Sequence, residues 1–233
     1  NLYERSLNYL FNHFGKAMPD SVLLRVRYRT VFHEPLHLKN PKTFNEKIQW
    51  LKLYDRNPEY HAMADKYAVR AYIGRVLGEK YLIPLLGVWQ KAEDIDFKSL
   101  PDQFVLKCTH DSQSIVICHD KAKLDKEEAV RRLGEALKID YSVLGREWAY
   151  HGIKPCIVAE ELLTDESGDD LKDYKVFCFN GEPKFIQVDY DRFKGHKRRL
   201  YTTDWNLMET KITYPDDADL IMPCLLYTSP SPR

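Results

Sequence analysis

The sequence predicts an α+β protein, in which antiparallel sheets with flanking helices follow a mainly helical N-terminal region. Two aromatic-rich apolar runs flank Asn180-Gly181, the strongest short signal for a β-hairpin. Apolar runs at 104–108 and 114–118 are typical of strands, and a polar loop separates them. Across residues 1–33, in contrast, apolar residues recur at helical spacing. These observations favour helices first and sheets later in the chain.

Helix signals continue through the first hundred residues. Thr43 and Glu46 match a capping box, in which each side chain accepts a hydrogen bond from the other residue's backbone N–H. A helix is therefore expected to begin there. A second helix is expected from Tyr60 to Gly78, because apolar residues recur on one side and glycine commonly ends helices. Residues 1–100 are thus predicted to form the helical region.

Strand signals dominate after Pro101. The strand at 114–118 leads into a helix for which Asp125 is the predicted N-cap, with Glu128 three residues later. Another strand is expected at 156–163, with the sequence CIVAEELL, before the hairpin. A third antiparallel strand, RRLYTTDW, is expected after the hairpin. The order from residue 101 onward is strand, loop, strand, helix, strand and hairpin.

Composition limits the classes of function. The chain has 233 residues, and 35 basic residues balance 35 acidic ones, so nothing global points to a nucleic-acid partner. No apolar run approaches the roughly 20 residues of a transmembrane helix. The five cysteines form no Cys-x-x-Cys pair. They are interpreted as free, mostly buried thiols of a cytosolic protein, not as disulfides or zinc ligands.

Seven segments carry a joint pattern through their order and spacing: NPKTFNEKIQWLKLYDRNPEY, ADKYAVRAYI, YLIPLLGVW, LPDQFVLKCTH, GREWAYHGIKPCIVAEELL, LKDYKVFCFNGEPKFIQVDYDRF and HKRRLYTTDWN. Together they resemble the TupA-like ATP-grasp family, which is linked to teichuronopeptide and other cell-surface polysaccharide synthesis. The resemblance covers about residues 40–223. It implies an ATP-grasp fold, with 101–164 as the small subdomain that carries the phosphate loop. Residues 165–223 would begin the C-terminal subdomain.

The resemblance implies that Lys107 contacts ATP phosphates. A lysine within an apolar strand costs free energy unless its charge finds an anion, although an edge-strand lysine that reaches water is the alternative. The following loop would cover the phosphates, with His110, Ser112 and Ser114 as candidate contacts. Such loops use glycine for close backbone approach, and the family pattern contains it. This chain lacks both glycines, and Asp111 adds a negative charge.

The end of the strand at 156–163 is the implied adenine hinge. The resemblance places Glu160, Glu161 and the backbone of Leu163 there, and a solvated turn is the alternative. On the first hairpin strand, Asp173 and Lys175 share a face because strand side chains alternate. Asp173 is assigned to ribose or to a structural pair, and Lys175 to phosphate.

The second hairpin strand carries a candidate metal site. Asp189 and Asp191 are expected to share a face, and two carboxylates at this spacing suit Mg²⁺ together with substrate phosphates. Surface charge is the commoner origin of this pattern. Lys175 alternatively forms a cross-strand ion pair with Asp189 or Glu182. Arg192 is well placed for phosphate or a substrate carboxylate.

Three charged residues of the helix after Tyr60 receive a structural interpretation. Asp65, Lys66 and Arg70 lie in the segment DKYAVR. They are predicted to form a helix cap and surface pairs along the helix, and no catalytic role is assigned to them.

The resemblance implies an ATP-dependent carboxylate–amine ligase with Lys107, Lys175 and Arg192 as catalytic residues and ATP and Mg²⁺ as cofactors. Its small-molecule substrates would be an amino acid or amine and a uronic acid or polysaccharide precursor, joined in the cytoplasm. One alternative is a sugar transferase of polysaccharide assembly, because Asp189-Tyr190-Asp191 formally fits its metal motif. Another is a non-catalytic fragment that binds nucleotide weakly or not at all.

Both ends of the chain are unusual. ATP-grasp folds of the family take further metal ligands from a strand pair that should follow Pro223, so the chain is expected to be truncated there. Residues 224–233 are expected to be an unrelated or disordered tail, because they show no periodicity. The chain begins at Asn1 without a methionine, so its true N-terminus is expected to lie upstream.

Overall fold

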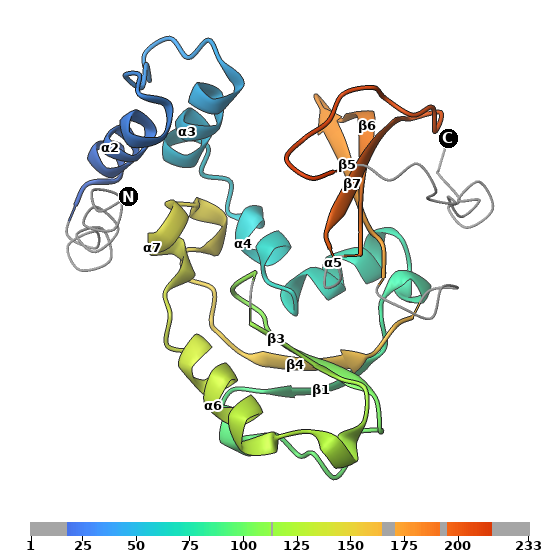
Figure 1. The fold of residues 1–233 in the computed structure, drawn as a ribbon. Helices are drawn as coiled ribbons and strands as arrows, with labels where there is room; N and C mark the ends of the chain where they lie inside the picture. The colour runs from blue at the N-terminus through green and yellow to red at the C-terminus, as the bar shows by residue number, and fades with distance from the viewer. Residues whose placement is uncertain (1–17, 113, 165–170, 192–194, 216–233) are drawn as a thin grey trace. The chain divides into compact units, whose positions relative to one another are not determined.

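The computed structural model describes residues 18–112, 114–164, 171–191 and 195–215 (Figure 1). The chain divides into two compact units, Asn1–Leu162 and Leu163–Arg233, which we treat separately. Helices and antiparallel sheets are both present, so the predicted α+β class is confirmed. Within the described residues, no helix is both long and apolar enough to cross a membrane.

The first unit begins with two paired helices, α2 (Asp20–Phe32) and α3 (Phe44–Tyr54). The predicted capping box of α3 is confirmed. Glu46 N donates to Thr43 Oγ1 at 3.2 Å, and Thr43 N donates to Glu46 Oε2 at 2.9 Å. The two helices share a small apolar cluster made of Leu24, Tyr28, Leu36 and Leu38, with Leu53 packed against it.

The next segment was expected to form one helix, and that expectation is wrong. Two helices occupy it, α4 (Glu59–Ala64) and α5 (Ala68–Val76). Asp65 interrupts the helix because its Oδ1 accepts from the backbone N–H of Tyr67 at 2.8 Å. A side chain that satisfies nearby backbone donors competes with the helical ladder. Lys66 N likewise donates to a carbonyl outside both helices.

A four-stranded antiparallel sheet forms the centre of the first unit. Its strands stand in the order β1-β4-β2-β3. Their bounds are β1 (Leu85–Trp89), β2 (Phe104–Cys108), β3 (Ile115–Cys118) and β4 (Ile157–Glu161). The predicted strands of the segments FVLKC, SIVIC and CIVAEELL are thereby confirmed. The shorter elements are α7 (Tyr141–Gly145) and the 3₁₀ turns η2 (Glu79–Tyr81), η3 (Ala92–Asp94), η4 (Lys121–Lys123) and η5 (Trp148–Tyr150).

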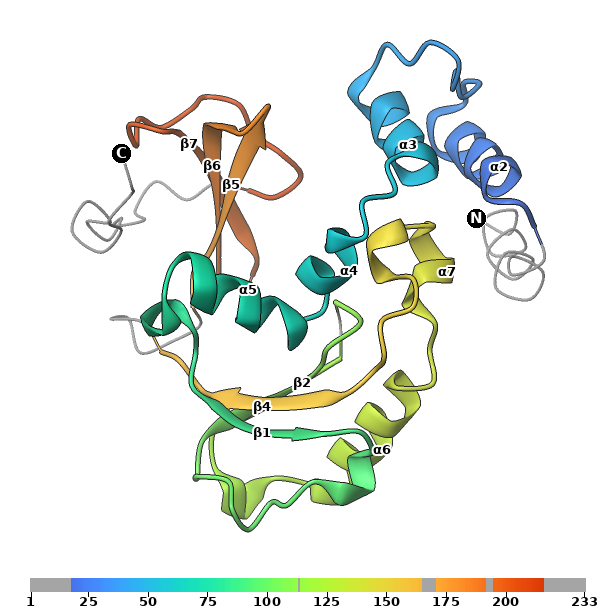
Figure 2. The same cartoon turned by 180° about the vertical axis from the view of Figure 1, so that it is seen from behind.

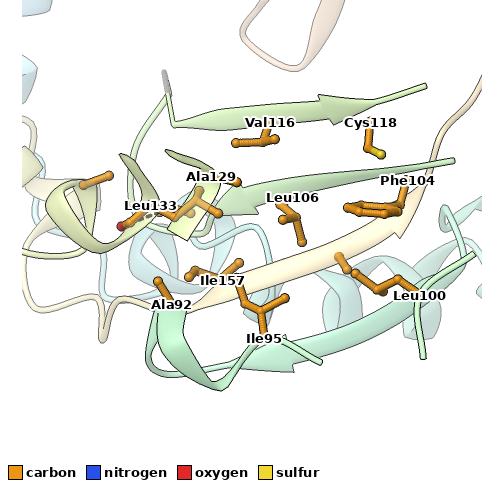
Figure 3. Close-up of a cluster of buried hydrophobic side chains, with 13 residues drawn as sticks. Ala92, Ile95, Leu100, Phe104, Leu106, Val116, Cys118, Ala129, Leu133 and Ile157 are labelled. Carbon is orange, nitrogen blue, oxygen red and sulfur yellow. Dashed lines mark hydrogen bonds between the residues drawn. The ribbon is translucent and has the colours of Figure 1, made fainter. Parts of the chain in front are cut away.

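One face of this sheet packs on α6 (Lys126–Ala136) and forms the main core (Figure 3). Phe104 and Leu106 of β2 and Ile157 of β4 are fully buried there, against Leu133 of α6. These alternate strand residues point to one side because strand side chains repeat every two residues. Burying each such side chain contributes about 1.5–3 kcal/mol to folding.

The predicted N-cap of α6 is confirmed. Asp125 Oδ1 accepts from the backbone N–H of Glu128 at 2.9 Å. The Glu128 carboxylate instead accepts two hydrogen bonds of 2.7 Å from Arg131, one turn further along the helix. Because the Arg131 guanidinium binds both oxygens of Glu128, this carboxylate does not accept from the backbone N–H of Asp125, and the capping box is incomplete.

The second unit contains a three-stranded antiparallel sheet in the order β5-β6-β7. Its strands are β5 (Asp173–Phe179), β6 (Glu182–Tyr190) and β7 (Lys197–Thr202). Asn180 and Gly181 form the two-residue turn of the predicted hairpin, with φ of 54° and 81°. Positive φ at both positions is what a type I′ turn requires. The hairpin and the third strand are confirmed.

Candidate functional site

The face of the four-stranded sheet opposite the main core carries charge. Strand alternation turns Lys107 of β2 and Glu160 of β4 to this side. Figure 2 shows α5 on this side of the sheet, whereas α6 covers the other. The chain can therefore bring side chains of α5 to the two strand residues.

Glu160 connects α5 with the central strands. It is 6% exposed, and both of its oxygens accept from cations. Lys107 Nζ donates to Oε2, and Arg70 Nη1 donates to Oε1 at 3.0 Å. Arg70 Nη2 also donates to the carbonyl of Ile83 at 2.6 Å. The guanidinium fixes Glu160, and Glu160 in turn fixes the ammonium of Lys107, whose side chain remains 24% exposed.

A second cation of the same segment holds the loop after β2. Lys66 Nζ donates to the carbonyls of Cys108, at 2.8 Å, and of Asp111. Burial lowers the pKa of Lys66, although the nearby charge of Asp111 opposes that effect. The interpretation of Lys66 and Arg70 as surface pairs along a helix is therefore wrong, because both bind groups of the sheet or its loop.

The side chains of the predicted phosphate loop already contact other groups of the protein. His110 is 3% exposed, and its Nε2 lies 3.1 Å from the carbonyl of Ile139. Asp111 is 6% exposed, and its carboxylate accepts from both the backbone N–H and the hydroxyl of Ser114. Ser112 remains exposed and pairs with a tyrosine hydroxyl. The roles predicted for His110, Ser112 and Ser114 toward ATP stay predictions.

The predicted hinge residues lie at the other end of these strands. Glu161 and Leu163 have exposed side chains, in contrast to the buried Glu160. Glu161 lines a hollow of about 800 Å³ at the edge of the sheet, together with Asp102, Gln103, His119, Asp120 and Leu162. Lys107 does not line this hollow. The adenine assignment of these residues remains a prediction.

In the second unit, one buried carboxylate accepts hydrogen bonds from four donor atoms of three side chains. Asp189 is 1% exposed. It accepts from Lys175 at 2.9 Å, from Gln187 at 2.8 Å and from Arg198 at 2.6 and 3.2 Å. His196 Nε2 lies 3.1 Å from Oδ1, which is within ion-pair distance, but the angle does not allow a hydrogen bond. Burial alone would raise the pKa of Asp189, but these partners outweigh it and hold the pKa well below its usual range.

The ion-pair alternative for Lys175 is confirmed, since its ammonium bonds Asp189 across the strands and Asp173 on its own strand. Asp191 does not share a strand face with Asp189. It follows the last residue of β6 with φ of 52°, and its carboxylate lies 3.3 Å from Lys197. Arg192, the remaining predicted catalytic residue, lies outside the described residues.

The donor set around Asp189 does not fit Mg²⁺. Its two oxygens already accept from Lys175, Gln187 and Arg198, and cationic neighbours repel a divalent ion. Across the ranges that the structure describes, no group of three or more His, Cys, Asp or Glu side chains is placed to hold a metal ion.

Comparison with protein families adds the remaining observation. The family described as TupA-like ATPgrasp matches residues 46–222, most of the chain. The chain belongs to the TupA-like ATP-grasp family. No curated protein and no solved structure matches it. The family match takes in the seven strands of the described residues and the segments that carry Lys66, Arg70, Lys107 and Glu160.

Arg70 and Lys66 are the functional candidates that the sequence analysis passed over. Lys66 lies in the turn before α5 and Arg70 lies within that helix, so the two do not share a helix face. The contacts of Lys66 with Cys108 and of Arg70 with Glu160 span 42 and 90 residues, so no local rule identifies them.

Proposed function

We propose that this TupA-like ATP-grasp protein is an ATP-dependent carboxylate–amine ligase of cell-surface polysaccharide biosynthesis, acting in the cytoplasm. The terminal phosphoryl group of ATP would pass to a carboxylate oxygen, giving an acylphosphate and ADP. An amine would then attack the acyl carbon, release inorganic phosphate and lose a proton to form an amide. The substrates would be an amino acid or amine and a uronic acid or polysaccharide precursor.

The observation that carries the proposal is the pair of cations bound to Glu160. Glu160, fixed by Arg70, orients the ammonium of Lys107 on a partly exposed sheet face. A positioned ammonium near the transferred group stabilises developing phosphoryl charge, and positioning supplies most of the catalysis in phosphoryl transfer. The family match supplies the expectation that the anion is ATP.

The residues proposed to hold ATP fit an anion on this face. Lys107 would neutralise phosphate charge, and the hydroxyls of Ser112 and Ser114 would donate to phosphate oxygens. Glu161 and the backbone of Leu163 would face adenine.

Isothermal titration with Mg·ATP tests the proposal. The unaltered protein should bind, and Lys107→Ala should weaken binding at least about tenfold because one charge-assisted contact is lost. Lys98→Ala is the matched control, because Lys98 is exposed outside the site. Binding that survives unchanged in Lys107→Ala would remove Lys107 from the proposed site, and no binding by the unaltered protein would contradict the ligase.

A nucleotide-binding module without turnover is the second candidate. The closed loop favours it, because Asp111 turns its carboxylate onto Ser114, a group otherwise available to phosphate. This candidate predicts that Mg·ATP binds but that no ADP forms with any amine and carboxylate pair. The sugar transferase gains no such support, because Asp189 of its formal metal motif is already held by protein donors.

A further inference from the structure

A hollow of about 380 Å³ lies in the first unit, away from Lys107. Its wall comes from α2, the end of α3 and the segment 140–151. The charged and aromatic side chains that line it include Asp20, Arg56, Asp140, Arg146, Glu147 and Trp148. Both signs of charge therefore meet in one cavity of the size that commonly holds small molecules.

Arginine side chains converge on one part of this wall. Asp20 stands between Arg56, at 3.6 Å, and Arg146, at 3.2 Å. Burial and the charge of Arg146 both lower the pKa of a third guanidinium, Arg27. Two guanidinium groups therefore contact the Asp20 carboxylate. A second carboxylate, supplied by a ligand, would be attracted to this part of the wall.

The backbone holds Arg146 in an uncommon conformation that serves this wall. Arg146 ends α7 with φ of 53°, in the left-handed region where glycine is the usual residue. Its side chain is 10% exposed and lies against Asp20. This conformation directs the chain so that the Arg146 side chain reaches Asp20.

Trp148 adds an aromatic ring to the same wall. The guanidinium of Arg56 lies 4.6 Å from its ring centroid, and the ring of His151 stacks on it at 5.4 Å. The indole N–H is buried, so the ring, and not its N–H, is the part of Trp148 that a ligand in the hollow would meet.

Carboxylates line the rest of the hollow. Asp140 Oδ1 caps α7 by accepting from the backbone N–H of Ser142 at 3.1 Å. Glu147 is about half exposed, at 46% of its side chain, and lies 3.5 Å from Lys52. Both carboxylates retain further lone pairs that an ammonium group can share.

We propose that this hollow binds a free amino acid as its zwitterion. The guanidinium N–H groups of Arg56 and Arg146 that do not already donate to Asp20, Leu53 and Met18 receive its carboxylate. Asp140 and Glu147 receive its ammonium group. A ligand with only one of the two charges would contact only one of these two groups of side chains.

The hollow is connected to the predicted phosphate loop through α7. The Tyr141 hydroxyl bonds the Ser112 hydroxyl, and His110 Nε2 lies 3.1 Å from the carbonyl of Ile139. The ring of Tyr141 also packs edge-on against Tyr150, 4.9 Å away. Binding of the amino acid to this hollow does not rest on the proposed ligase.

Binding is tested on the full chain without ATP. A thermal-shift screen of the twenty standard L-amino acids should find at least one that raises the Tm, and isothermal titration gives its Kd. The N-acetyl and the carboxamide derivatives of that amino acid should each bind at least about tenfold more weakly, because each lacks one charge. Arg56→Gln should weaken binding by a similar factor, and Arg56→Lys should recover part of it.

Arg75→Gln is the matched control, since Arg75 also lies over an aromatic ring, that of Tyr72, but does not line the hollow. Circular dichroism establishes that each variant is folded. No amino acid binding, equal binding of both derivatives, or unchanged binding in folded Arg56→Gln would each overturn the proposal. Amino acid binding without ATP binding would uphold the hollow and contradict the ligase, and the reverse would contradict the hollow alone.

Discussion

Two buried carboxylates, Glu160 in the first unit and Asp189 in the second, are each paired with a lysine and an arginine but differ in their further contacts. Each lies on a sheet and accepts from a lysine and an arginine. Within the described residues, the Glu160 carboxylate is bound by those two cations, and its lysine projects from a central strand. Asp189 has two further partners, Gln187 and His196. The difference indicates that Glu160 orients a lysine, whereas in the second unit the cations immobilise the carboxylate.

The largest effect is expected from removing the charge of Asp189. Asp189→Asn leaves the guanidinium of Arg198 and the ammonium of Lys175 without their shared anion. Breaking a buried ion pair from one side costs about 3–5 kcal/mol, and we expect about 3 kcal/mol because Lys175 can return to water. Urea denaturation measures the free energy of unfolding. Asp204→Asn, at an exposed position, is the control. Equal stability of the two variants would contradict a structural role for the Asp189 ion pairs.

A smaller effect, on binding instead of folding, is expected from Arg70→Gln. Without the guanidinium, Glu160 pairs with Lys107 alone and holds its ammonium more completely. We expect Mg·ATP to bind about tenfold more weakly, a loss of about 1.4 kcal/mol. Arg75→Gln on the same helix controls for the loss of a nearby positive charge. If both variants bind ATP equally, Arg70 does not position Lys107.

The smallest effect is expected at Glu46, a carboxylate held mainly by backbone donors. Hydrogen bonds from the backbone N–H groups of Thr43 and Lys42 lower its pKa from 4.5 to about 2. A lowered folded-state pKa stabilises the protein above the ordinary value, and that contribution is lost as the pH falls from about 4.5 toward 2. The stability difference between the unaltered protein and Glu46→Gln should therefore shrink over this range. Glu34→Gln, at an exposed position, should show no such trend.

Local rules explain which parts of the fold were predictable. The Asn180-Gly181 hairpin and the Thr43 capping box depend on residues adjacent or three apart, so their sequence signals are complete in themselves. The break between α4 and α5 was missed because Asp65 competes with a helix that its neighbours favour. Helix propensity is too weak to outweigh such a side-chain hydrogen bond.

The candidate site was less predictable because its residues meet only in the folded chain. Lys107 was identified from its unusual place in an apolar strand, but its partner Glu160 lies 53 residues away in the sequence. Arg70, the other cation on Glu160, lies 90 residues from it. Asp191 was placed on the wrong surface because strand alternation was extended one residue past the end of β6. Pairing across such separations follows from topology, which no short pattern contains.

The cysteines give the protein a built-in site for chemical labelling. Burial raises the pKa of the Cys108 thiol to about 12, and it also raises the pKa values of Cys118 and Cys156. Thiolates are the reactive form, so these three side chains are shielded twice, by sterics and by protonation. Cys178 on β5 is the exposed thiol among the described residues. With Cys224 replaced by serine, a maleimide fluorophore would report on the second unit alone.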